Sequence, residues 1–144
     1  MGFVVDFSQL ESYVKNMKVT QRDFESFLSG FLLRMAGEVV KETKLKQSGH
    51  YGDEFRAYDT GAMTNAWKLG NIHHNGKDLS VEILNAMEYA TEIEFGRPRK
   101  KNGVEVGWIN GHFMMTTSIE HIQKQMPAAY EVEFSNFCRS HGIA

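Results

Sequence analysis

The longest regular pattern in the chain is the stretch QRDFESFLSGFLLRMAGEVVKETKLKQ, residues 21–47. Its apolar residues recur at steps of three or four: Phe24, Leu28, Phe31, Met35 and Val39. This spacing places them on one face of a helix, and charged residues fill the other face. We predict a long amphipathic helix over most of 21–46, with Thr20 as its N-cap and Ser48-Gly49 ending it.

Two further elements are expected on either side of this helix. Upstream, Ser8 and Glu11 stand at capping-box spacing, which predicts a short helix over 8–17. Downstream, a loop over 48–62 leads to Asn75-Gly76, which separates two apolar runs, the second of them alternating at period two. Asn-Gly favours the type I′ turn that joins antiparallel strands, so we predict a β-hairpin over 66–84.

The rest of the chain predicts a short helix, a loop and a final helix. Residues 86–95 have apolar positions at helical spacing, and Gly96 suits the position after a helix. Residues 96–103 are expected to form an exposed basic loop, followed by a small strand over 104–108. A second amphipathic pattern covers 112–125 and continues past Pro127, where we expect a bend.

These elements predict an α+β fold in one domain, residues 1–144. Two long amphipathic helices would pack on a small antiparallel sheet with a β-hairpin, and a short extra helix would complete it. A chain of 144 residues with 42% hydrophobic residues can bury a core without disulfides or metals.

Composition excludes several classes of protein. The apolar runs are far too short for a membrane span, and no secretory signal pattern stands at the amino end. The single cysteine, Cys138, cannot form an internal disulfide and suits a reducing compartment. Sixteen basic and eighteen acidic residues give a net charge of −2, so the chain as a whole is not a basic nucleic-acid binder.

No reaction centre can be recognised, and we expect no enzyme, cofactor or metal site. His73 and His74 would point to opposite faces of a strand, which prevents them from sharing one ion. Cys138 lies on the apolar stripe of the last helix and is expected to pack there. Asp59-Thr60-Gly61 matches the active-site tripeptide of aspartic proteases, but those enzymes bury two such aspartates between apolar segments, and here the flanks are a polar loop and a hairpin.

Three phrases in a fixed order carry more information: Asp59-Thr60-Gly61-Ala62-Met63, Tyr89-Ala90-Thr91-Glu92-Ile93-Glu94-Phe95-Gly96, and Gly111-His112-Phe113-Met114. Together they resemble the small head–tail joining or tail-completion ("neck") proteins of long-tailed bacteriophages and prophages. The likeness covers about residues 20–138. Members of that family have a long helix, the D-T-G turn, a hairpin, the Y-A segment, a variable loop and a C-terminal helix.

The resemblance implies a structural virion protein at the neck or tail end, present in the host cytoplasm before assembly. It implies a homo-oligomeric ring, hexameric in the virion and compatible with a monomer in solution. Other head–tail connector or tail-tube proteins would be its partners, DNA would pass through the ring, and no membrane would be involved. The matching residues are Asp59, Thr60, Gly61, Tyr89, Ala90, Glu94, Gly96 and Phe113.

Each of these residues also has a plain structural explanation. Gly61 would allow a tight turn, and Asp59 could accept backbone hydrogen bonds there. Tyr89 and Phe95 would pack the short helix on the sheet. Glu92 and Glu94 would face solvent or a neighbour, and Phe113 would anchor the last helix.

Two questions stay open at the level of sequence. Arg97, Arg99, Lys100 and Lys101 form either a solvated loop or a contact with another virion protein or with DNA. The chain could also be a host adaptor or regulatory protein-interaction domain, or a small enzyme with its site between subunits.

Overall fold

The computed structural model describes residues 2–6, 21–52, 61–76 and 78–142. The predicted helix over 8–17, the proposed N-cap Thr20, and the motif residues Asp59 and Thr60 lie outside these ranges. The described elements are β1 (Gly2–Asp6), α2 (Gln21–Gln47), α3 (Ala62–Ala66), β2 (Trp67–Asn75), β3 (Asp78–Asn85), α4 (Ala90–Phe95), β4 (Gly96–Lys101), β5 (Val104–Asn110) and α5 (Met114–Ser140). The α+β class is confirmed.

The long helix α2 forms as predicted, because its apolar stripe has a core to pack on. The stripe is almost completely buried: Phe24, Leu28, Phe31, Leu32, Ala36 and Val39. The helix ends at Gln47, and the amide of Gly49, which has a φ of 89°, donates to the carbonyl of Lys46. Glycine at this position ends the helix without a steric penalty.

The predicted hairpin is the centre of a three-stranded sheet. β2 and β3 pair antiparallel across Gly76, which has a φ of 64°, and alternate β3 residues Leu79, Val81 and Ile83 are buried. β1 pairs antiparallel with the other edge of β3, giving the order β1-β3-β2. The sequence did not predict β1, nor the short helix α3 before β2. α2 packs against β2 and β3.

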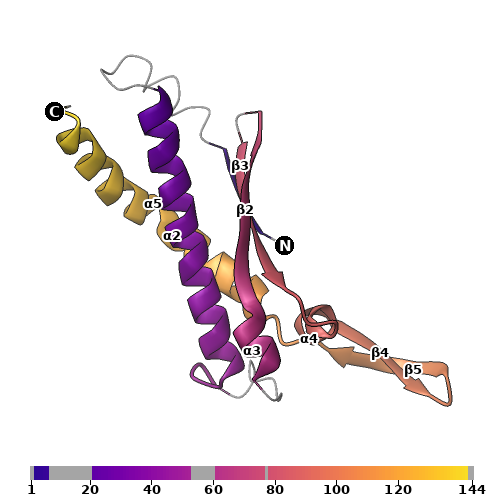
Figure 1. Ribbon diagram of the computed structural model, residues 1–144. Coiled ribbons are helices and arrows are strands. Elements are labelled where there is room, and N and C mark those ends of the chain that lie inside the picture. The colour runs from indigo at the N-terminus through magenta and orange to yellow at the C-terminus, as the bar shows by residue number, and fades with distance from the viewer. Residues whose placement is uncertain (1, 7–20, 53–60, 77, 143–144) are drawn as a thin grey trace.

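The last helix, α5, runs from Met114 to Ser140 with Pro127 inside it. Its C-terminal half lies on the side of α2 that faces away from the sheet, and its N-terminal half passes α2 towards α4 (Figure 1). Aromatic rings from both helices fill the space between them: Phe24, Phe27, Phe31, Tyr130, Phe134 and Phe137. Burial raises the pKa of the Tyr130 hydroxyl above its usual range.

The predicted basic loop over 96–103 is wrong: these residues begin a second, two-stranded sheet. β4 and β5 pair antiparallel and meet at Asn102 and Gly103, which have φ values of 54° and 79°. Positive φ at both turn residues is the mark of the type I′ hairpin. We call this hairpin, residues 96–110, the arm, because it points away from the rest of the structure (Figure 1).

Candidate interaction surface: the arm and its junction

The arm leaves the body at a junction built from the second and third sequence phrases. α4 ends at Phe95, and the next residue, Gly96, which has a φ of 95° and ψ of 176°, starts β4. β5 ends at Asn110, and residues 111–113 lead into α5. The two ends of the arm therefore meet beside α4. The segments around Gly96 and Gly111, which belong to the second and third sequence motifs, hold these ends together.

Glu94 lies at the centre of this junction. Its side chain is buried, although the sequence analysis expected it to face solvent or a neighbour, so that expectation is wrong. One carboxylate oxygen accepts from the amide of Met115 at 3.0 Å, and the other from the amide and hydroxyl of Thr116 at 2.7 and 2.8 Å. The first amides of a helix have no partner within the helix, and a carboxylate there also complements the helix dipole. Glu94 therefore caps α5.

The backbone completes the junction in the opposite direction. The amides of His112 and Phe113 donate to the carbonyls of Ile93 and Glu94, at 2.9 and 3.0 Å. α4 thus caps the start of α5 with a side chain, and the segment before α5 caps the end of α4 with backbone amides. Both sets of otherwise unpaired groups are satisfied within the protein.

Glycine is required at the two crossing points of the junction. A Cβ at Gly111 would lie 2.2 Å from the Glu94 carbonyl oxygen, and one at Gly96 would lie 2.5 Å from the Ile109 carbonyl oxygen. Both distances are far inside van der Waals contact with backbone atoms, which cannot move aside as a side chain can. The close approach explains why these two positions are glycine.

The aromatic residues of the phrases have different environments. Tyr89 and Ala90 pack against the core, whereas Phe95 is 38% exposed. Phe113, expected to anchor the last helix, is 41% exposed and adopts a left-handed conformation, with a φ of 50°. It makes an edge contact with Phe95, and the neighbouring Met114 is the residue that enters the core. The expectation for Phe113 is therefore wrong.

Only part of the first phrase is described. Gly61 has a φ of 89° and its carbonyl accepts from the amide of Asn65, so it turns the chain into α3. Met63 is completely buried. The positive φ agrees with a turn that favours glycine.

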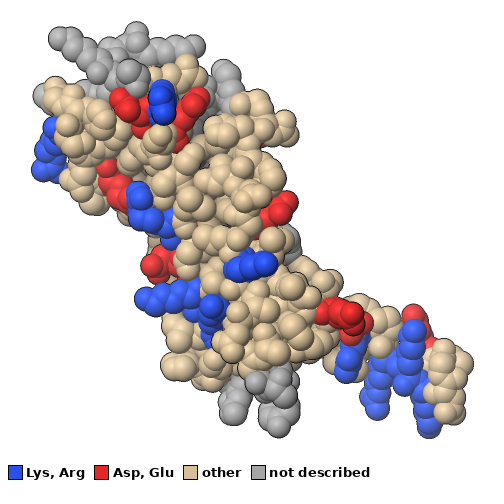
Figure 2. Space-filling model, viewed as in Figure 1, with Lys and Arg blue, Asp and Glu red and all other residues tan. Residues whose placement is uncertain are grey.

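The four predicted cations all lie on β4 and are exposed. Arg97, Arg99, Lys100 and Lys101 give the arm a row of positive charge, which Figure 2 shows along one side of it. The Arg97 guanidinium lies 3.6 Å from the Glu92 carboxylate, an exposed pair of small energetic value. Arg99, Lys100 and Lys101 are exposed on the arm.

Both faces of the arm have apolar and charged residues, and the pairing of its strands shifts register between Arg99 and Lys100. Arg97 pairs with Ile109 and Arg99 with Gly107 on one face, whereas Pro98 pairs with Trp108 on the other. Val104, Val106 and Trp108 of β5 are 64%, 56% and 58% exposed. They do not share one face, because Trp108 pairs with Pro98 whereas Val104, beyond the register shift, pairs with Lys101. These exposed apolar residues were not predicted to lie on a hairpin, because a loop was expected where β4 lies. Asn102-Gly103, the same turn signal as Asn75-Gly76, could have revealed the hairpin.

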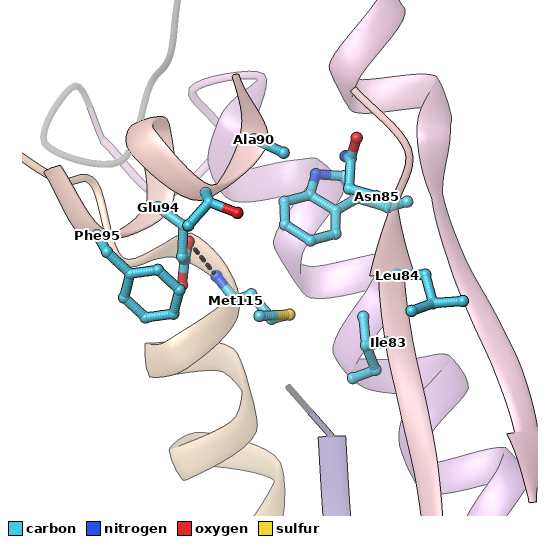
Figure 3. Close-up of a pocket in the computed structure, with 9 residues that line it drawn as sticks. Ile83, Leu84, Asn85, Ala90, Glu94, Phe95 and Met115 are labelled. Atoms are coloured by element: carbon cyan, nitrogen blue, oxygen red, sulfur yellow. Dashed lines mark hydrogen bonds between the residues drawn. The ribbon is translucent and has the colours of Figure 1, made fainter. Parts of the chain in front are cut away.

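A small pocket opens beside the junction. It has a volume of about 190 Å³ and lies between β2, β3, α4 and the start of α5 (Figure 3). Apolar residues such as Ile83, Leu84 and Met115 line it together with the polar residues Asn85, Thr91 and Glu94. Ligand pockets usually enclose roughly 300–1,000 Å³, so this one is the size of a side chain.

Two buried charged residues of α2 are partnered with each other. Glu42 and Lys46, both on α2, form a buried pair with Oε2 and Nζ 3.3 Å apart, and Nδ1 of His121 on α5 lies 2.5 Å from Oε1 of Glu42. His73 and His74 are both exposed on β2. Within the described ranges, no three His, Cys, Asp or Glu residues are grouped so that they could hold a metal ion. No helix among the described residues has the length and apolar character to cross a membrane.

Comparison with known proteins identifies the family. No curated protein and no solved structure matches the chain. One family model matches residues 9–96, which is more than half of the chain, and is described as "Bacteriophage HK97-gp10, putative tail-component". The match contains the D-T-G and Y-A phrases and ends at Gly96, where the arm begins. The chain therefore belongs to the HK97-gp10-like family of phage tail components, which are structural proteins of the virion.

Proposed function

We propose that this protein joins the head to the tail, or completes the end of the tail, by assembling as a ring at the phage neck. The observation that carries the proposal is the arm: a hairpin that points away from the body and has exposed basic and apolar residues. A connector must bind neighbouring proteins through such surfaces. The family match supplies the setting, since a tail component contacts other phage structural proteins.

The ring is proposed as hexameric in the virion, around a channel through which DNA passes. The chain would be present in the host cytoplasm before assembly and could remain a monomer there, because a symmetric partner can template weak contacts. The basic row on β4 fits a position near DNA or near an acidic partner protein.

We propose further that the protein works without catalysis and without a cofactor. Glu94, the most completely buried carboxylate among the described residues, is used for capping α5. Glu42 is held by Lys46 and His121. Neither carboxylate is left available as a general acid or base in a cleft, which is the arrangement that acid–base catalysis needs.

Deletion of the gene from the parent phage tests this function. We expect DNA-filled heads and finished tails that fail to join, or tails whose ends are not regulated, when the lysate is viewed by electron microscopy. A plasmid copy of the gene should restore joined particles. Normal infectious particles from the deletion strain would overturn the proposal and favour a host adaptor.

A further inference from the structure

We propose that the arm binds duplex DNA through one basic face, on which Arg97, Arg99 and Lys101 contact the phosphate backbone. The inference rests on the proposed function for its setting, since a ring around DNA brings the protein to that ligand. It goes further by naming the surface that makes the contact. An arm with this role points its basic face towards the channel of the ring.

Three of the four cations of β4 share one face of the arm. Successive residues of a strand point to opposite faces, so Arg97, Arg99 and Lys101 lie together and Lys100 lies on the other face. The register shift does not interrupt this row, because the extra residue is Val106 on β5, whereas β4 continues without an insertion. The basic face is therefore continuous along β4.

The acidic residue of the arm lies away from this face. Glu105 pairs with Lys100 and so belongs to the opposite face. At the base of the arm, the Glu92 carboxylate on α4 lies 3.6 Å from the Arg97 guanidinium, and both side chains are more than half exposed. An exposed ion pair of this kind contributes little to stability, so a phosphate can take the place of the carboxylate.

The spacing of the three cations suits a linear polyanion. Residues of an antiparallel strand rise about 3.4 Å each, so Arg97 and Lys101 are separated by about 14 Å. Duplex DNA carries one negative charge per about 1.7 Å of its axis, which gives about eight phosphates over that length. Each cation therefore finds a phosphate in any register, and an arginine can bind one through two parallel hydrogen bonds. A folded acidic protein would need carboxylates at matching positions.

The middle of the basic face is open to a close approach. The β5 residues opposite the three cations are uncharged: Ile109, Gly107 and Val104. No atom lies within 4 Å of a Cβ built at Gly107, so a DNA backbone has room beside Arg99. The arm is also a projecting two-stranded ribbon (Figure 1), and the major groove of B-DNA is wide enough to admit such a ribbon.

Net charge directs DNA to the arm and away from the body. The arm, residues 96–110, has four basic residues and one acidic residue, a net charge of +3. The whole chain has a net charge of −2, so the remaining residues carry −5. DNA is therefore attracted by the arm and repelled by the rest of the molecule.

A nuclear magnetic resonance titration of the full chain tests the contact. A short DNA duplex of mixed sequence is added to isotopically labelled protein at low ionic strength, where weak electrostatic binding is strongest. We expect the backbone amide signals of β4 and β5 to shift with added DNA, and those of β2 and β3 to stay unchanged. Absence of shifts on the arm, or shifts confined to the body, would overturn the proposal.

Two double variants of equal net charge separate the basic face from charge in general. Arg99→Gln/Lys101→Gln removes two cations of the face. The control, Lys100→Gln/Lys124→Gln, removes one cation from the opposite face and one exposed cation from α5. All four side chains are exposed, so both variants should keep the circular dichroism spectrum of the unmodified chain.

We expect the first variant to bind DNA at least fivefold more weakly and the control less than twofold more weakly. Each phosphate contact contributes about 0.9 to the slope of log Kd against log salt concentration, so the slope should fall by about 1.8 in the first variant. Equal losses of affinity in the two variants would overturn the proposal.

Polyglutamate distinguishes an acidic protein as the partner. Weaker binding of polyglutamate than of DNA at equal charge concentration supports the proposal, and binding as tight as that of DNA overturns it. These results are independent of the deletion experiment. If deletion prevents joining but DNA does not bind the arm, the proposed function stands and this surface is wrong. If DNA binds the arm but deletion leaves normal particles, the surface stands and the function is wrong.

Discussion

The Glu94 carboxylate accepts a hydrogen bond of 2.7 Å from the backbone amide of Thr116, a residue 22 positions further along the chain. The whole arm lies between these two residues in sequence. The bond therefore closes the base of the arm and fixes its direction relative to α5. Two phrases that look separate in the sequence form one structural unit.

Replacing Glu94 with alanine should destabilise the protein by about 1–3 kcal/mol, because two amides at the start of α5 lose a buried partner. Glu94→Gln keeps one oxygen as an acceptor and should lose less. Glu92→Ala, an exposed neighbour on the same helix, should change stability by less than about 0.5 kcal/mol. Urea unfolding of the three variants measures these differences. Equal stability of Glu94→Ala and Glu92→Ala would show that the cap is unimportant.

Gly111→Ala should destabilise the protein by about 2–3 kcal/mol, since the new methyl group would overlap backbone atoms of α4. Gly107, in the same strand–linker segment, is a matched control, because no atom lies within 4 Å of a Cβ built there. Gly107→Ala should change stability by less than about 1 kcal/mol, in the stabilising direction. Thermal unfolding of both variants measures the two changes in stability. Similar losses of stability at both positions would refute the close approach of Gly111 to α4.

Phe24→Ala should cost about 3–5 kcal/mol, because the ring is buried and contacts Phe134 and Phe137 across the helix interface. Phe113→Ala removes a ring that is 41% exposed and should cost less than about 1.5 kcal/mol. Denaturant midpoints with unchanged slopes would measure both effects. A loss at Phe113 as large as that at Phe24 would mean that the last helix is anchored at Phe113 after all.

Short-range sequence patterns correctly predicted the elements that depend on neighbouring residues, namely α2 and the β2–β3 hairpin. The stripe of α2 has a period of three to four residues, and the β2–β3 hairpin has Asn-Gly between alternating runs, so both were correct. The arm has the same turn signal at Asn102-Gly103, but Pro98 and four charges suggested a loop. Proline is tolerated in a hairpin strand with a free edge, and a strand exposed on both faces needs no apolar alternation.

Features that depend on distant partners were missed. β1 pairs with β3, more than seventy residues away, and nothing within Gly2–Asp6 signals that partner. Glu94 was expected outside because of its charge, yet its hydrogen-bond donors are backbone amides of a helix that begins twenty residues later. Backbone amides have no sequence signature, so a buried carboxylate that caps a distant helix cannot be read from residue types alone.

The position of this protein within the virion tests most directly whether it joins the head to the tail or completes the tail end. An epitope tag after the last residue follows the end of α5, which Figure 1 places far from the arm, and it allows the protein to be labelled with gold in purified particles of the parent phage. We expect label at the junction between head and tail or at the end of the tail, and none along the tail tube. Label distributed along the tail, or particles without label although the tagged protein is expressed, would contradict it.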